Sequence, residues 1–169
     1  DNRLTSITSG NTTKTYKYDN FNRAEQYITS HNGKNVIEEN INYNKTTGTS
    51  ATIQIATHQF IIADKDISYT YTYDANGNIV SINELAAVGK TQSSFTTSYV
   101  YDSQSQLIRE NNPYAGKTWI WTYDKSGNII SRSEYEYTTD TPTELLDIVL
   151  YEYTNSEWGD LLTNYDGQS

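Results

Sequence analysis

Tyr71-Thr-Tyr73-Asp74-Ala-Asn-Gly77-Asn-Ile79 is the stretch that decides the fold, because the chain repeats it as Trp121-Thr-Tyr123-Asp124-Lys-Ser-Gly127-Asn-Ile129. The two copies share the aromatic, Thr, Tyr, Asp, Gly, Asn and Ile positions. Tyr-Asp dipeptides begin at positions 18, 73, 101, 123 and 165, where chance would give about one in the whole chain. The sequence is therefore built on a repeat.

Weaker copies of this motif fill most of the remaining chain. One copy has Asn22 where the glycine stands, another has Ser105 there, and the last has Thr154 in place of the aspartate. These copies are Tyr16-Lys-Tyr18-Asp19, the degraded Ile41-Asn-Tyr43-Asn44, Tyr99-Val-Tyr101-Asp102 and Tyr151-Glu-Tyr153, and Asn2-Arg3-Leu4 resembles the back half of another. Successive second tyrosines lie 25, 30, 28, 22 and 30 residues apart, which is typical of one supersecondary unit per repeat.

Backbone chemistry predicts that each motif forms a hairpin turn. An aspartate at the first of four turn residues accepts hydrogen bonds from the turn's own amides, and a glycine at the fourth supplies the left-handed residue of a type I turn with a bulge. Asparagine tolerates that conformation but serine does not, so we expect about 1 kcal/mol of strain at Ser105. Across the bulge, Tyr73 should oppose Ile79 and Tyr123 should oppose Ile129.

Aromatic residues recur at every second position beside these turns, which places each set on one face of a strand. Tyrosine, threonine, isoleucine and valine favour strands, whereas alanine and leucine are few. The sets are Tyr69, Tyr71 and Tyr73; Tyr99 and Tyr101; Trp119, Trp121 and Tyr123; Tyr135 and Tyr137; and Tyr151 and Tyr153. We predict an all-β fold in which aromatic rows do much of the packing.

Further turn signals separate the motifs, at His31 to Lys34, Val88 to Lys90, Asn112 to Gly116 and Thr139 to Thr143. The simplest topology is an up-and-down antiparallel sheet of about ten to fourteen strands, which right-handed twist would curve or coil. Residues 44–66 and 83–98 are the least regular, and any helical insertion would lie around Glu84 to Val88. We predict that residues 1–169 form a single array of about six hairpin repeats, degenerate over 30–66.

Charge and composition exclude several classes of partner. The formal net charge is -9 and the 12 basic residues are scattered, so neither nucleic acid nor an anionic membrane surface is expected to bind. No apolar run reaches the ~20 residues of a membrane helix. Without cysteine there is no disulfide, thiolate metal site or cysteine nucleophile. The absence of methionine and of a signal segment suggests an internal fragment, whose open sheet edges should associate; a clean monomer in light scattering would contradict this.

The titratable residues predict no catalytic, cofactor or metal site. His31 lies in a predicted turn and His58 in a strand-like stretch, without the carboxylate spacing of a triad or metal centre. The two fullest turns gather oxygen atoms, yet their glycine is misplaced for an EF-hand and no bidentate glutamate follows. Carboxylate pairs two apart share a strand face, as is common on solvated surfaces: Asp64 with Asp66, and Glu134 with Glu136. We therefore expect that the protein is not an enzyme.

The aromatic rows admit a structural and a ligand-binding interpretation. Tyrosine and tryptophan faces stack on sugar rings when exposed, and the same rows pack a sheet when the opposite face is polar, as it is here. Because few aliphatic residues are available for packing, we favour the structural interpretation. Trp119 and Trp158 are the residues we predict to stack on a ligand if any aromatic residue does so.

The motif Tyr-x-Tyr-Asp-x-x-Gly-x-Ile resembles the YD repeat of the Rhs family, which also includes Tc-toxin shell subunits and the teneurins. The stretch from Tyr151 to Gln168 is similar to wall-associated Rhs proteins of Gram-positive bacteria in particular. The resemblance implies a spiral of β-hairpins wound into a hollow shell, which holds a C-terminal toxin or presents an outer surface. The family's self-cleaving core domain has no counterpart in these residues.

The expected function is structural, a segment of a YD-repeat shell that encloses or displays an effector in a secreted or surface bacterial protein. Its partners would be the rest of its own array and an enclosed effector. The alternative is a module that binds cell-wall or host glycans.

Overall fold

The computed structural model describes residues 2–45 and 52–168, and every regular element in these ranges is a β-strand. The strands are β1 (Ser6–Ser9), β2 (Thr12–Tyr18), β3 (Ala24–His31), β4 (Lys34–Tyr43), β5 (Ile55–Ile62), β6 (Lys65–Tyr73), β7 (Ile79–Val88), β8 (Thr91–Tyr101), β9 (Leu107–Asn112), β10 (Lys117–Tyr123), β11 (Ile129–Glu136), β12 (Leu145–Glu152) and β13 (Asn164–Tyr165). They are hydrogen-bonded in chain order in one 13-stranded sheet. The predicted all-β, up-and-down antiparallel fold and its number of strands are confirmed.

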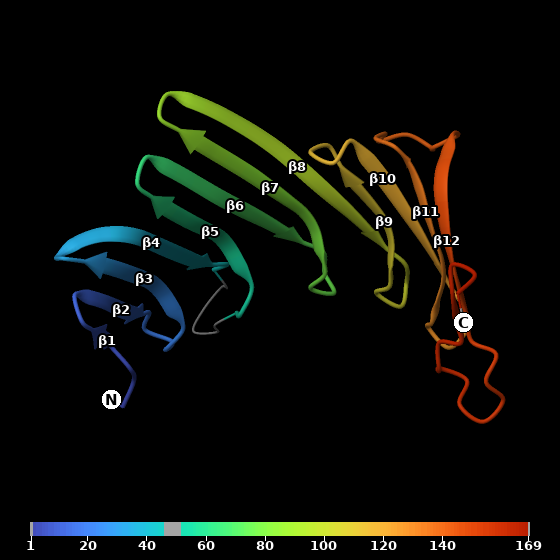
Figure 1. Ribbon diagram of the computed structural model, residues 1–169, viewed down its shortest axis with the longest axis horizontal. Coiled ribbons are helices and arrows are strands. Elements are labelled where there is room, and N and C mark those ends of the chain that lie inside the picture. Colours follow the sequence, from blue (N-terminus) through green and yellow to red (C-terminus); the bar gives the residue numbers. More distant parts are fainter. Residues whose placement is uncertain (1, 46–51, 169) are drawn as a thin grey trace. The chain divides into compact units, whose positions relative to one another are not determined.

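Two compact units make up the described chain, residues 1–72 with 82–95 and residues 73–81 with 96–169. Within each unit, hairpin follows hairpin along the sequence, as the colours of Figure 1 show. The first unit contains β1 to β5 in continuous antiparallel register, and the second contains β9 to β13. Sequential pairing keeps each strand close in sequence to its partner, which is the simplest way to order a sheet.

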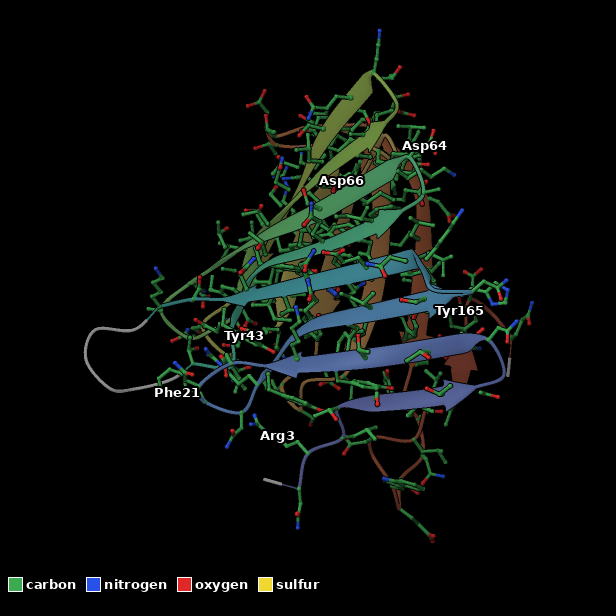
Figure 2. All side chains as sticks on the ribbon, turned by 90° about the vertical axis from the view of Figure 1, so that its left-hand side faces the viewer. Arg3, Phe21, Tyr43, Asp64, Asp66 and Tyr165 are labelled. Atoms are coloured by element: carbon green, nitrogen blue, oxygen red, sulfur yellow. The ribbon has the colours of Figure 1, made fainter. Side chains whose placement is uncertain are left out.

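Two kinds of turn alternate along the first unit. Motif turns lie at one end of the strands, and two-residue turns lie at the other. Between β3 and β4, His31 pairs with Lys34, and the φ angles of Asn32 and Gly33 are 51° and 75°, as a type I′ turn requires. Figure 2 shows Tyr43 near the motif-turn end of the unit and Asp64 in the turn at the opposite end.

The predicted separating turns are all present, at 32–33, 89–90, 113–116 and in the longer connection 137–144. The expectation of a helical insertion around Glu84 to Val88 is not met, because these residues form the second half of β7. Hydrogen bonding to neighbouring strands overrides the high helix propensity of Leu85 and the two alanines that follow it. Part of the irregular stretch 44–66 lies outside the described residues, and the rest contains β5 and the turn into β6.

Little of the described chain is fully buried. Among its hydrophobic residues, Ile41 and Val149 are buried, at 8% and 6% exposure, whereas the motif tyrosines are half-buried. Neighbouring rings cover one another across strands, as in the edge-to-face pair of Tyr16 and Tyr27, whose centroids are 5.5 Å apart. The aromatic rows therefore pack by lateral contact along the sheet.

A fully buried threonine, Thr118, lies on β10 in the second unit. The hydroxyl of Thr118 lies 3.1 Å from Oδ1 of Asn111 and 3.0 Å from the carbonyl oxygen of Thr138, and it accepts the Thr138 N–H at 3.0 Å. Arg109 donates through Nη2 to the carbonyl oxygens of Thr138 and Asp140, both at 2.7 Å. These bonds tie the connection after β11 down onto the sheet.

Candidate functional site

The motif aspartate organises its turn through both carboxylate oxygens. In the turn after β10, Oδ1 of Asp124 accepts the N–H of Ser126 at 2.8 Å and of Asn128 at 2.9 Å. Oδ2 accepts the side-chain amide of Asn128 at 3.0 Å. The backbone closes the same turn, because Gly127 donates to the carbonyl of Asp124 at 3.2 Å. Each part of the motif therefore has a conformational role.

The other motif turns have the same geometry. In each, one carboxylate oxygen accepts the backbone N–H of the second and fourth residues after the aspartate, at 2.8 to 2.9 Å. These turns begin at Asp19, Asp74 and Asp102. The fourth turn position has positive φ in all four copies, at Asn22 (65°), Gly77 (90°), Ser105 (63°) and Gly127 (93°). The predicted type I turn with a left-handed residue is confirmed.

Strand register confirms the predicted bulge. It shifts between Thr122 and Tyr123, so that Tyr123 lies opposite Ile129, as expected. The equivalent shifts place Tyr18 opposite Ala24 and Tyr101 opposite Leu107. The pairing of Tyr73 with Ile79 stays a prediction.

Replacing Ser105 by glycine is expected to stabilise the protein. The positive φ of Ser105 is strained for a residue with a Cβ, and glycine removes that strain. The variant also loses an exposed 3.1 Å hydrogen bond from Asn78 Nδ2 to Ser105 Oγ, so the net gain should be about 0.5 to 1 kcal/mol in thermal or urea unfolding. Ser105→Ala is the control, since it loses the bond and keeps the strain. An unchanged or lower melting temperature for Ser105→Gly would contradict the assignment.

Hydrogen bonding also sets the acidity of the turns. The Asn128 side chain and backbone amide hold the pKa of Asp124 below its ordinary value, and the amides of Asn78 do the same for Asp74. At Asp19, partial burial raises the pKa, but the bonds from Arg23 and from the Phe21 amide outweigh it and lower the pKa overall. These three turns are therefore built around an ionised carboxylate.

Folding stability should fall in acid and in strong base. A carboxyl group whose folded pKa is depressed contributes stability above its unfolded pKa and loses that stability as pH falls, so we expect weakening below about pH 4. The half-buried Tyr101 and Tyr123 act at the other end of the pH range: burial raises their pKa, so their contribution to stability is lost as pH rises above about 10. Urea unfolding from pH 2.5 to 10.5 measures both limbs. Asp124→Asn should flatten the acid limb, and an unaltered limb would contradict the assignment.

The second motif tyrosine links its repeat to the one before. The hydroxyl of Tyr123 donates to the carbonyl of Leu107 at 2.7 Å, and Leu107 is the first residue after the preceding motif turn. Tyr18, Tyr43 and Tyr101 make the same bond, to the carbonyls of Leu4 (2.9 Å), Ala24 (2.8 Å) and Ile79 (3.0 Å). Four copies of one contact thus fix the spacing between successive hairpins.

The preceding aspartate also affects the acidity of three motif tyrosines. Burial is the largest cause that raises the pKa of Tyr101 and of Tyr123. The next cause for each is the negative charge of the preceding turn, Asp74 for Tyr101 and Asp102 for Tyr123. Asp124 raises the pKa of Tyr153 in the same way. The charge of each motif turn therefore acts on the tyrosine of the following repeat.

Arginine strengthens this contact in the first two repeats. The guanidinium of Arg23 lies 4.1 Å from the ring centroid of Tyr43 and forms a 2.6 Å salt bridge with Asp19. Arg3 lies 4.8 Å from the ring centroid of Tyr18. Both arginines directly precede the residue whose carbonyl accepts the tyrosine hydroxyl. Figure 2 shows Arg3, Phe21 and Tyr43 toward the motif-turn end of the first unit.

Degraded motifs replace the aspartate by other groups. After β4, Asn44 donates its N–H to the carbonyl of Gln54 at 2.9 Å, which closes a longer loop. After β12, Oδ1 of Asn155 accepts the N–H of Glu157 at 2.9 Å and of Trp158 at 2.8 Å. Asn155, one position after the Thr154 that replaces the aspartate, therefore accepts backbone N–H groups of the turn as the aspartate does elsewhere.

The residues considered for catalysis are dispersed over the sheet. Nδ1 of His31 lies 2.9 Å from the Thr12 hydroxyl, and Nε2 of His58 lies 2.8 Å from Glu39. Lys117 contacts both Glu134 (3.5 Å) and Glu136 (3.3 Å). Within residues 2–45 and 52–168, no three His, Asp or Glu side chains gather into a metal site. No helix of the described chain is long and apolar enough to span a membrane.

The two candidate stacking residues differ in surroundings. Trp119 is half-buried on β10 and donates its indole N–H to Glu134 at 3.0 Å. Trp158 is 63% exposed in the loop before β13. Trp158 therefore presents an open ring, whereas Trp119 is held within the sheet.

Sequence reasoning missed the acceptors of the tyrosine hydroxyls and the two stacked arginines. The hydroxyl acceptor always follows the motif turn, five residues after the aspartate where one is present. Aligning that position across copies was the available signal. The acceptor is a backbone carbonyl oxygen, which every residue has, so the side chain at that position gives no indication of the contact.

Comparison with known families identifies the repeats. A family model described as Teneurin YD-shell matches residues 1–141. The matched range contains the four motif turns and ends before β12. No curated protein matches the chain.

Proposed function

Because this chain belongs to the Teneurin YD-shell family, we propose that it is a length of shell wall whose role is structural and not enzymatic. The observation that carries this proposal is the recurring bond from a motif tyrosine to the carbonyl that follows the preceding turn. A contact repeated at the same place in successive hairpins extends a wall one unit at a time, as in other repeat proteins.

The chemistry of the motif supports a structural role. The carboxylate of Asp124 accepts three hydrogen bonds from its own turn, and the hydroxyl of Tyr123 is engaged by Leu107. A nucleophile or general base needs a free lone pair directed at a substrate. Both motif groups are committed to the fold instead.

We further propose that the wall belongs to a secreted or surface protein of a bacterium and encloses or displays an effector. This part of the proposal depends on the resemblance of the motif and of residues 151–168 to Rhs-type wall-associated proteins. The net charge of -9 is compatible with an exposed, soluble wall and unfavourable for nucleic acid.

Cryo-electron microscopy and protease protection of the natural protein that carries these repeats would test the proposal. We expect these hairpins in the wall of a closed shell, and an enclosed segment that resists added protease until the shell is opened by denaturant. Combining Asp102→Ala with Asp124→Ala should weaken the wall and shorten that protection. An open sheet with no protected segment would contradict enclosure.

A glycan-binding role is the second candidate, and the exposed ring of Trp158 favours it. Aromatic faces that are open to solvent stack on sugar rings. A glycan array with the intact chain, with Trp158→Ala as the variant and Trp119→Phe as its control, would test this role. Binding that disappears only with Trp158→Ala supports it, and an array without signal removes it.

A further inference from the structure

A row of polar side chains crosses β3, β4, β5 and β6 on one face of the first unit. Gln26 pairs with Asn40, and Asn40 pairs with Gln59, so their side chains lie on the same face. The side chains are joined by hydrogen bonds: Gln26 Nε2 to Asn40 Oδ1 at 2.8 Å, and Asn40 Nδ2 to Gln59 Oε1 at 3.2 Å. Gln59 Nε2 then donates to both oxygens of Asp66, at 2.9 and 3.0 Å. We call these four residues the amide row.

A carboxylate fixes the direction of the amide row. An ionised Asp66 accepts and cannot donate, so Gln59 must present its nitrogen to it. The oxygen of Gln59 then faces Asn40, which must present its own nitrogen, and the same step repeats at Gln26. Glu38 imposes the same orientation, because its Oε1 accepts from Gln26 Nε2 at 3.1 Å and from Asn40 Nδ2 at 3.2 Å.

The amide row ends on an unused acceptor. Oε1 of Gln26 is buried and receives no hydrogen bond from any described residue. Each donation toward Asp66 polarises the next amide, so the last oxygen is a stronger acceptor than that of an isolated glutamine. A buried acceptor without a donor is unfavourable, and a donor supplied at this point would be bound.

A shallow groove of about 220 Å³ lies at this end of the amide row. Its lining is Lys17, Glu25, Gln26, Asn40, Ile41 and Asn42. The volume exceeds the roughly 30 Å³ share of one water molecule and is below the roughly 300 Å³ of the smallest drug-sized pockets, which suits one small ring. One lysine and one glutamate balance the charge, and the amides offer donors and acceptors, so the groove suits a neutral polar ligand.

We propose that this groove binds one neutral, hydroxyl-rich ring, a single sugar residue, through a hydroxyl that donates to Oε1 of Gln26. Lys17 on β2 pairs with Gln26 on β3 and is exposed. Its flexible side chain therefore moves aside to admit the ligand. Asp66 does not touch the ligand. It is a positioning residue that acts along the amide row. The site is separate from Trp158, and it does not depend on the shell function.

Saturation-transfer NMR with the intact chain, using glucose and N-acetylglucosamine as probes, tests the proposal. We expect at least one of them to bind with a Kd on the order of 1 mM, as befits a few hydrogen bonds in a shallow site. Gln26→Ala should weaken binding at least about tenfold, since it removes the acceptor. Circular dichroism melting would show that the variant is folded, and Gln59→Ala offers a second interruption of the amide row.

Asp66→Asn tests the direction of the amide row. The change is made together with Glu38→Gln, because Glu38 alone would keep Gln26 and Asn40 in their orientation. Both new amides can donate as well as accept, which releases the orientation of every amide up to Gln26, and binding should weaken roughly threefold or more. Asp64→Asn, also combined with Glu38→Gln, is the matched control: it makes the same change in charge two residues away, in the turn outside the amide row, and should bind as tightly as Glu38→Gln alone. Figure 2 labels both aspartates.

Three results would overturn the proposal. The first is no saturation transfer from either sugar to the folded chain. The second is binding that survives Gln26→Ala or disappears with Trp158→Ala, either of which would place the site elsewhere. The third is equal affinity of the Asp66→Asn and Asp64→Asn variants when each is combined with Glu38→Gln, which would remove the directional row as its basis. Failure of the shell proposal leaves all three measurements interpretable.

Discussion

Tyr123→Ala is expected to lower the free energy of unfolding by about 3 kcal/mol. About half of this loss comes from the half-buried ring and the rest from the hydroxyl. The hydroxyl donates to Leu107 at 2.7 Å, and without it a partly buried carbonyl oxygen loses its partner. Because this bond joins one repeat to the preceding one, its loss should loosen the sheet between hairpins. Urea unfolding monitored by circular dichroism measures the change.

Tyr123→Phe separates the two contributions. It retains the ring and should cost about 1 to 2 kcal/mol for the hydrogen bond alone. Tyr16→Phe is the matched control, because the Tyr16 ring is half-buried on its strand like that of Tyr123, while its hydroxyl bonds to none of the described residues. Equal stability of the two phenylalanine variants would contradict the proposed link between repeats.

The hairpin turns could be predicted from sequence because their determinants are local. Aspartate, glycine and the bulge lie within five residues, so the spacing of Asp124 and Gly127 indicated the turn and the pairing of Tyr123 with Ile129. The same rule identified Ser105 as a strained position, and its φ of 63° confirms this. Interactions confined to one turn leave a direct signature in the sequence.

Contacts between hairpins could not be predicted in this way. The repeats are 22 to 30 residues apart, and varying strand and loop lengths hide which carbonyl each tyrosine reaches. The amide row was missed for a related reason: Gln26, Asn40 and Gln59 come from three strands, and each alone resembles a solvated polar residue. Only the pairing of strands brings them together.

Aromatic residues pack along the sheet as predicted, but their rings are less deeply buried than expected. Tyrosines were expected to replace aliphatic residues in a core, and the described tyrosines of the motif are half-buried in lateral rows instead. A sheet without helices to cover it buries a ring mainly against its neighbours in the same layer. The Tyr123 hydroxyl can then reach a backbone acceptor, for which phenylalanine has no donor.

Asp102→Ala should be the second strongly destabilising change, with an expected loss of about 2 to 3 kcal/mol. Oδ1 of Asp102 accepts the N–H of Gln104 and of Gln106, both at 2.9 Å, and bonds to a charged acceptor are the stronger kind. Because the positive φ of Ser105 already strains this turn, its folded conformation is less stable than that of the turns with glycine. Asp102→Asn is the matched control: its amide oxygen can accept both N–H groups, so it should lose less than about 1 kcal/mol. If the alanine and asparagine variants unfold at the same urea concentration, the carboxylate oxygen is not what holds the turn.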